Sequence, residues 1–104
     1  MMDWETYREW TRTTAQYPKD REEEYLMLGL ANEVGELLGK YKKQIRGDGD
    51  KSEEIRAELG DVCWYLVRLF DHYELRLMDV LHENFLKLND RKKRGVIKGD
   101  GDHR

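Results

Sequence analysis

The chain has 104 residues, of which 38% are hydrophobic and 39% charged, and this is enough for one domain with its own core. Its net charge of −3 excludes a uniformly basic nucleic-acid-binding protein, so no nucleic-acid partner is expected. The single cysteine, Cys63, excludes an intrachain disulfide and fits a reducing compartment. Because the first residues do not resemble a signal peptide and no apolar run reaches the roughly 20 residues of a membrane span, we expect a cytoplasmic protein without a membrane partner.

The first two predicted elements are helices. Residues 3–17 form the first, which begins at the candidate N-cap Asp3, stops before Pro18 and carries on one face Trp4, Tyr7, Trp10 and Thr14. The second, residues 20–47, begins with Asp20 and Glu23 at capping-box spacing and ends at a glycine. It is the longest element that the pattern predicts.

A third helix is predicted over residues 52–73, with Asp50 or Ser52 as its cap. Its apolar stripe comprises Ile55, Leu59, Val62, Leu66, Leu69 and Tyr73. Trp64 projects about 180° from Ile55, so this helix is apolar on two sides. Such a helix is central in its fold or lies at a subunit interface, and we therefore expect a homo-oligomer, either a dimer or a dimer of dimers.

The fourth predicted helix covers residues 76–92, and a glycine-rich polar tail follows it. No alternating strand pattern occurs anywhere in the sequence. We expect an all-α, four-helix bundle-like protein in which residues 1–94 form a single helical domain. The tail, residues 95–104, is expected to be flexible or to cover a substrate.

Two pairs of acidic residues lie in the middle of predicted helices. Glu33 and Glu36 interrupt the apolar pattern of the second helix, and Glu58 and Asp61 do the same in the third. Glu33 projects only about 20° from Leu26, inside the apolar stripe. Other acid pairs at this spacing lie near helix ends, so the position of these two pairs, rather than their spacing alone, makes them candidates for a site.

Acid pairs on neighbouring helices favour a bound cation. Two carboxylates about 5 Å apart repel each other by about 3 kcal/mol at an effective dielectric constant near 20. Oxygen ligands without histidine or cysteine favour Mg²⁺ or Mn²⁺ over Zn²⁺. The alternative is that both pairs are solvated edges of amphipathic helices and that some of the acids pair with lysines.

Basic residues end the second and fourth helices. The second closes with Lys40, Lys42, Lys43 and Arg46, where the helix dipole also favours cations. The fourth, interrupted by Asn84, carries Lys87, Arg91, Lys92, Lys93 and Arg94. Acids for a metal ion beside bases for an anion suggest a metal-bridged polyphosphate, although basic residues at a helix end are more often only solvated.

These features together resemble the MazG-like nucleoside triphosphate pyrophosphohydrolases. The signature of that family is two acids three residues apart, a spacer, and two more acids three apart, which this chain meets with a spacer of 21 residues. The similarity extends over about residues 24–102 and includes Asn84, Lys87, Arg91, Arg94 and the glycine-rich ending. The chain holds one such unit, whereas larger members of the family hold two.

The resemblance implies a MazG or dimeric dUTPase type of fold and the hydrolysis of a nucleoside triphosphate, NTP or dNTP, to the monophosphate and pyrophosphate. It implies Mg²⁺, with Mn²⁺ as a substitute, on Glu33, Glu36, Glu58 and Asp61, and Glu36 is the expected catalytic residue, which orients or deprotonates the attacking water. The expected substrate-binding residues are Lys40, Asn84, Lys87, Arg91 and Arg94. No element marks a particular base or sugar. The rival interpretation is a non-catalytic helical dimerisation or interaction module.

Overall fold

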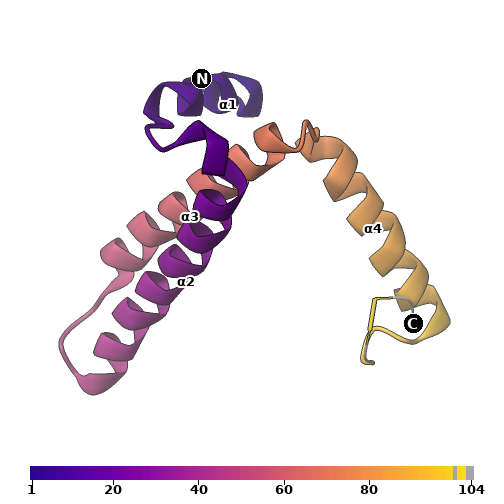
Figure 1. The fold of residues 1–104 in the computed structure, drawn as a ribbon. Coiled ribbons are helices and arrows are strands. Elements are labelled where there is room, and N and C mark those ends of the chain that lie inside the picture. Colours follow the sequence, from indigo (N-terminus) through magenta and orange to yellow (C-terminus); the bar gives the residue numbers. More distant parts are fainter. Residues whose placement is uncertain (100, 103–104) are drawn as a thin grey trace. The chain divides into compact units, whose positions relative to one another are not determined.

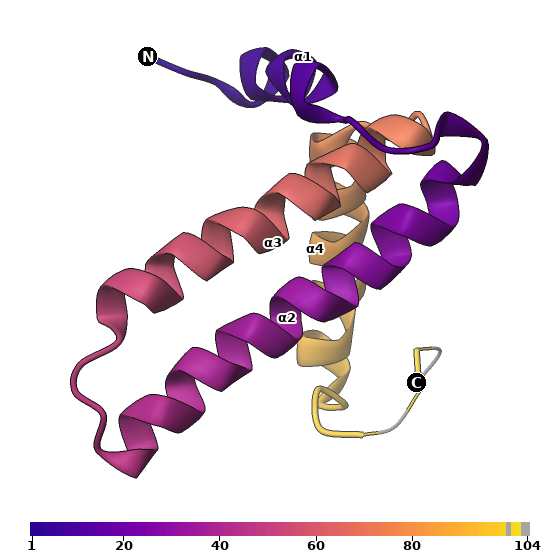
Figure 2. The same cartoon turned by 60° about the vertical axis from the view of Figure 1, so that its left-hand side comes forward.

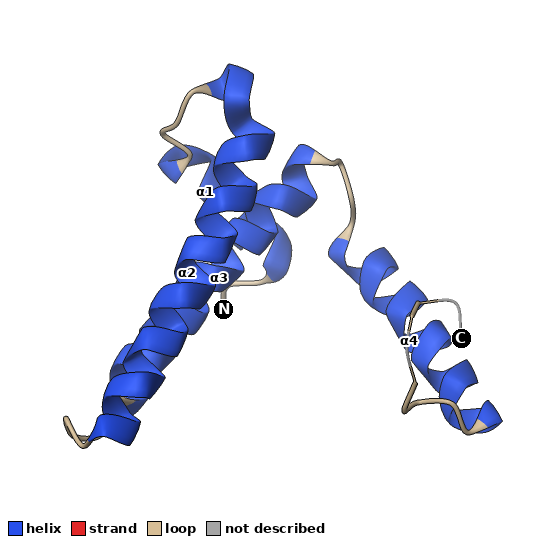
Figure 3. Cartoon of the chain, turned by 60° about the horizontal axis from the view of Figure 1, so that its bottom comes forward, coloured by secondary structure: helices blue, strands red, loops and turns tan. Residues whose placement is uncertain are grey.

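The structure is a computed structural model that describes residues 1–99 and 101–102. Its elements are α1 (Trp4–Thr14), a 3₁₀ turn (Lys19–Arg21), α2 (Glu22–Arg46), α3 (Ser52–His72) and α4 (Leu77–Arg94) (Figure 1). No strand occurs among the described residues (Figure 3), and the predicted all-α class is confirmed. The chain divides into two compact units, Met1–Glu74 and Leu75–Arg104, which are described separately. The predicted division into residues 1–94 and 95–104 stays a prediction.

Helix α1 begins where the sequence predicts and ends three residues earlier. Asp3 is the N-cap, since its carboxylate accepts a hydrogen bond of 2.8 Å from the Thr6 N–H. Ala15 leaves the helical region with a ψ of 73°, which ends the helix well before Pro18. The residue that α1 buries is Thr11, whereas Trp10, on the predicted face, is 50% exposed.

Helices α2 and α3 form an antiparallel hairpin and lie side by side along most of their length (Figures 1 and 2). Gly47 ends α2 with a φ of 96°, a left-handed conformation that favours glycine. The Asp50 carboxylate accepts a hydrogen bond of 3.1 Å from the Ser52 N–H, but Lys51 occupies the N-cap position of α3 without a side-chain cap, so the predicted cap by Asp50 or Ser52 does not form. The predicted capping box of Asp20 does not form, because a 3₁₀ turn precedes α2 and the helix starts at Glu22 without a side-chain cap.

The core lies at one end of the hairpin, where α1 joins it. The buried residues of the cluster are Ala15, Tyr17, Leu26 and Leu69, and the partly buried residues packed against them are Leu30, Trp64 and Tyr65. Further toward the loop between α2 and α3, the predicted stripe of α3 is more open, with Leu59 49% exposed. Of the six predicted stripe residues, all of which the structure describes, Leu69 alone is buried.

The second apolar side of α3 is covered in part by α1 of the same chain. The indole N–H of Trp64 donates a hydrogen bond of 2.8 Å to the Thr14 hydroxyl, and the Trp4 ring packs edge-on against Phe70 with centroids 6.0 Å apart. Trp64 therefore does not by itself require a partner subunit. The expectation of a homo-oligomer rests instead on other exposed apolar side chains, such as Leu28 and Ile45, which are each 71% exposed.

A buried arginine joins α1, α2 and α3. The Arg68 guanidinium donates to the Asp71 carboxylate at 2.6 Å and to the Thr11 hydroxyl at 3.3 Å, and it lies 3.7 Å from a carboxylate oxygen of Glu22. Asp71 also accepts two hydrogen bonds, of 2.9 and 2.8 Å, from Arg12. The hydrogen bonds from Arg12, followed by those from Arg68, outweigh burial and hold the pKa of Asp71 well below its usual range.

The second unit consists of α4 and the segment that follows it. Helix α4 runs to Arg94, two residues beyond the prediction, and ends at Gly95 in a left-handed conformation with a φ of 72°. Within the described residues, no helix has the length and apolar character needed to cross a membrane.

Candidate metal centre

Three of the four predicted metal ligands converge in the first unit. Glu33 and Glu36 come from α2 and Glu58 from α3, and one ligand atom from each lies within 4.8 Å of the others. The antiparallel hairpin causes this proximity, because it sets the middle of α2 against the middle of α3 (Figure 2). We call these three residues the acidic cluster.

Two oxygens of the acidic cluster are buried without a hydrogen-bond partner in the described part of the chain, Oε2 of Glu33 and Oε2 of Glu58. Burial, the adjacent Glu58 carboxyl and the negative charges of Glu36 and Asp61 raise the pKa of Glu33 to about 7. A buried carboxylate oxygen without a donor is unfavourable unless a proton or a cation satisfies it. The electrostatics of the acidic cluster therefore favour the binding of a positive charge.

The fourth predicted ligand, Asp61, lies at the edge of this arrangement. It is exposed on α3, and its charge contributes to the raised pKa of Glu33, but it is not among the three residues whose ligand atoms converge. Glu36 is also exposed, and its Oε1 accepts a hydrogen bond of 3.5 Å from the Asn32 amide. Asn32 was not predicted, although it lies one helical turn before Glu36 and thus on the same face.

The donor set fits a hard divalent cation. The acidic cluster offers carboxylate oxygens only, from two helices, and Mg²⁺ binds to proteins through one or two carboxylates together with water or phosphate oxygens. Glu36 is exposed, whereas one oxygen each of Glu33 and Glu58 is buried without a hydrogen-bond partner in the described part of the chain, so the acidic cluster is open to solvent on the side of Glu36. A phosphate oxygen can therefore approach an ion held there.

A hollow of about 340 Å³ adjoins the acidic cluster between α2 and α3. Its lining residues are Glu36, Gly39, Lys40, Lys43 and Glu58. The predicted substrate residue Lys40 thus lies beside two of the carboxylates. Lys43 was not among the predicted site residues, and the signal that could have identified it is its spacing of three residues from Lys40 on the same helix.

The other predicted substrate residues belong to the second unit. Asn84 and Lys87 line a hollow of about 310 Å³ on α4. Lys87 forms an ion pair of 2.8 Å with Asp102, and Arg91, which is 4% exposed, donates hydrogen bonds to the carbonyl and the carboxylate of the same aspartate. Arg94 forms an ion pair of 2.8 Å with Asp90. These three cations of α4 therefore already have carboxylate partners.

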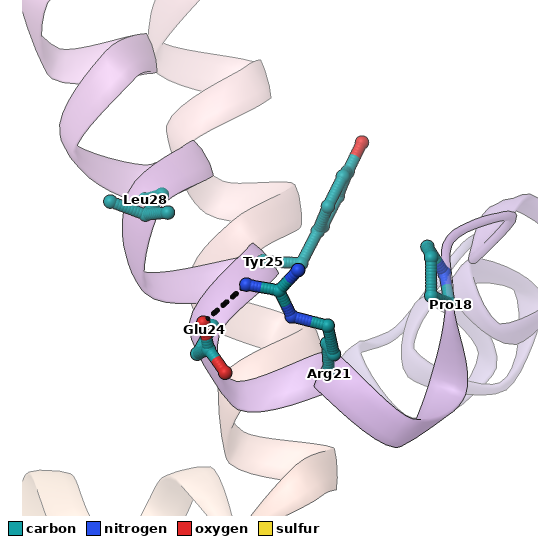
Figure 4. A pocket seen from close by; sticks show the side chains of 5 residues that line it. All are labelled: Pro18, Arg21, Glu24, Tyr25 and Leu28. Atoms are coloured by element: carbon teal, nitrogen blue, oxygen red, sulfur yellow. Dashed lines mark hydrogen bonds and ion pairs between the residues drawn. The ribbon is translucent and has the colours of Figure 1, made fainter.

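A further pocket, of about 200 Å³, lies at the start of α2, away from the acidic cluster (Figure 4). It is lined by Pro18, Arg21, Glu24, Tyr25 and Leu28. Its charged members, Arg21 and Glu24, pair with each other at 2.8 Å, and the ring of Tyr25 stacks on that of Tyr17 with centroids 4.8 Å apart. This pocket was not predicted from the sequence.

Comparisons with known proteins identify the family. The model of the MazG nucleotide pyrophosphohydrolase domain matches residues 21–96, a range that contains both acid pairs. The chain is 42% identical over 85 residues to the Gene 37 protein of Mycobacterium phage L5, and the match covers 77% of this chain and 75% of that protein. No solved structure matches the chain. The chain therefore belongs to the MazG nucleotide pyrophosphohydrolase domain family.

Proposed function

We propose that the protein hydrolyses a nucleoside triphosphate, either NTP or dNTP, to the monophosphate and pyrophosphate in a Mg²⁺-dependent reaction. Membership of the MazG family supports nucleotide pyrophosphohydrolase activity in general. The observation that carries the proposal is the acidic cluster, in which carboxylates from two helices converge to within 4.8 Å and two buried oxygens lack a donor. Such a site suits a metal-bridged polyphosphate.

The proposed ligands of the ion are Glu33, Glu36, Glu58 and Asp61. When bound, Mg²⁺, or Mn²⁺ in its place, neutralises phosphate oxygens and makes the phosphorus more susceptible to attack. Asp61 is the proposed fourth ligand because it lies one helical turn after Glu58 on α3, and its negative charge contributes to the raised pKa of Glu33. In this proposal α2 and α3 would each contribute two carboxylates, and Asp61 would join the three that converge in the structure.

Glu36 is the proposed catalytic residue. It is exposed, and the hydrogen bond from Asn32 orients one of its oxygens, which leaves the second oxygen able to accept a proton from water. In the proposed step the water oxygen bonds to phosphorus, the bridging P–O bond breaks, and pyrophosphate or the monophosphate departs with the electron pair. The proton of the water passes to the carboxylate.

The proposed substrate residues are Lys40, beside the acidic cluster, and Asn84, Lys87, Arg91 and Arg94 of α4. The ion pairs of Lys87 and Arg91 with Asp102 support this role, since both of these α4 side chains already bind a carboxylate. A phosphate would compete with Asp102 for them.

Analysis of reaction products tests the proposal. The purified protein is incubated with each common NTP and dNTP plus Mg²⁺, and the monophosphate, diphosphate, pyrophosphate and orthophosphate are resolved. We expect monophosphate and pyrophosphate, with the rate lowered by about 10² to 10⁴ in Glu36→Gln, the range for loss of a general base. Glu53→Gln, an exposed acid at the start of α3, is the matched control and should retain activity. Orthophosphate as the main product, or equal rates in both variants, would contradict the proposal.

The second candidate is the non-catalytic interaction module, which the exposed apolar side chains Leu28 and Ile45 favour. The same side chains support the proposed homo-oligomer, a dimer or a dimer of dimers, and sedimentation of a monomer at micromolar concentration would contradict it. A module without a metal site should melt at the same temperature with and without Mg²⁺. The cytoplasmic location and the lack of a nucleic-acid partner stay predictions.

A further inference from the structure

We infer that Lys43, together with Lys40, binds the pyrophosphate part of the nucleotide, so that the triphosphate extends from the acidic cluster along α2 toward the C-terminal end of that helix. This inference rests on the proposed function. It adds the direction in which the substrate lies, and it adds Lys43 to the predicted substrate-binding residues.

The geometry of the hollow between α2 and α3 carries the inference. Lys40 and Lys43 line it together with Glu36 and Glu58, which are members of the acidic cluster. Lysines three residues apart on a helix project from the same side, so both ammonium groups can reach one ligand in the hollow. Acidic and basic side chains therefore line the same hollow, and the two lysines lie further along α2 than Glu36 does.

The two lysines differ from the cations of α4 in their partners. Lys87, Arg91 and Arg94 each form an ion pair with an aspartate. Within the part of the chain that the structure describes, Lys40 and Lys43 form no ion pair, although two carboxylates line the same hollow. Their charges are therefore available to a ligand without breaking an existing contact.

The charge on pyrophosphate explains why a cation is needed at this place. The carboxylates of Glu36 and Glu58 repel a polyphosphate wherever a metal ion does not neutralise them. When water attacks the α phosphorus, pyrophosphate departs with the electron pair of the broken P–O bond and takes an additional negative charge. The ammonium groups of Lys40 and Lys43 offset that charge as it develops. Among the described residues, no aromatic ring lines the hollow, so it suits phosphates rather than a nucleotide base.

Binding of inorganic pyrophosphate in the presence of Mg²⁺ tests the inference without relying on turnover. Calorimetry on the full chain compares Lys43→Met with Lys42→Met, which removes the same charge from the adjacent position that does not line the hollow. We expect about tenfold weaker binding of pyrophosphate for Lys43→Met, less than twofold weaker binding for Lys42→Met, and partial recovery with Lys43→Arg. Because Lys43 is exposed, its replacement should not affect folding.

The steady-state kinetics supply a second readout. Inhibition by pyrophosphate should weaken in Lys43→Met by the same factor as binding, while the thermal shift with Mg²⁺ alone stays unchanged. Equal pyrophosphate affinity in Lys43→Met and the unmodified protein, or equal losses in both methionine variants, would overturn the inference. If no nucleotide is hydrolysed, the proposed function fails, and the calorimetry still decides whether the two lysines bind pyrophosphate.

Discussion

Replacing Gly29 by alanine tests how closely α2 and α3 pack beside the acidic cluster. A Cβ atom on Gly29 would lie 2.1 Å from Cε1 and 2.5 Å from Cζ of the Tyr65 ring. That ring also packs against Trp64, with centroids 4.9 Å apart, so it cannot turn aside without disturbing the core. Gly35, further along α2, has nothing within 4 Å of its Cβ position and is the matched control.

The expected effect is the difference between two terms. Alanine stabilises either helical position by about 1 kcal/mol relative to glycine. At Gly29 the added methyl group also overpacks the contact with Tyr65, which costs about 1–3 kcal/mol. Gly29→Ala should therefore be less stable than Gly35→Ala by about 1–3 kcal/mol, and each kcal/mol corresponds to about 4–8 °C in Tm for a domain of this size.

Thermal unfolding followed by circular dichroism in the presence of a chelator measures this difference. Because Glu33 lies one turn after Gly29, we also expect Gly29→Ala to bind Mg²⁺ more weakly than the unmodified protein. If both alanine variants melt at the same temperature, the close approach of the two helices at Tyr65 is refuted.

Three further predictions follow from the buried charges. The pKa of Glu33 is raised from 4.5 to about 7, so without metal the stabilisation from this group is present at acid pH and is lost as the pH rises toward 7. The Tm measured over a pH series should therefore fall across this range, and Glu33→Gln should remove that pH dependence. Mg²⁺ at 100 times its Kd should raise the free energy of unfolding by about 2.7 kcal/mol in the Glu53→Gln control but not in Glu58→Gln, as measured by urea denaturation. Asp71→Asn leaves Arg68 buried without its closest carboxylate and should destabilise the fold by about 3 kcal/mol in the same assay; no change would show that the ion pair contributes nothing.

The helices and the two acid pairs could be predicted because they depend on local patterns. The spacing of apolar residues identified all four α-helices, and Asp3 and Gly47 marked a start and an end that the structure confirms. The position of acidic residues inside apolar stripes likewise identified Glu33 and Glu58. In the described part of the chain, each of them has a buried carboxylate oxygen without a hydrogen-bond partner. Their role as metal ligands stays a prediction.

The features that sequence reasoning missed depend on contacts between distant residues. Burial of Thr11 and Arg68 follows from a hydrogen bond across 57 positions, for which a helical pattern contains no signal. The apolar stripe of α3 does not indicate which of its residues are buried; α1 covers only one end of the hairpin, and Leu59 is exposed. The ion pair of Lys87 with Asp102 similarly joins α4 to a segment in which composition predicts no structure.

Uneven burial along the α2–α3 hairpin implies that the two halves differ in their rates of amide hydrogen exchange. Among the described residues, the fully buried side chains of these helices lie near α1, whereas the acidic cluster lies nearer the loop. Local opening should therefore begin at the loop end, since few apolar contacts hold it. A cation shared by Glu36 and Glu58 would tie the helices together at that weakly held end, so that occupation of the metal centre and rigidity of the hairpin increase together.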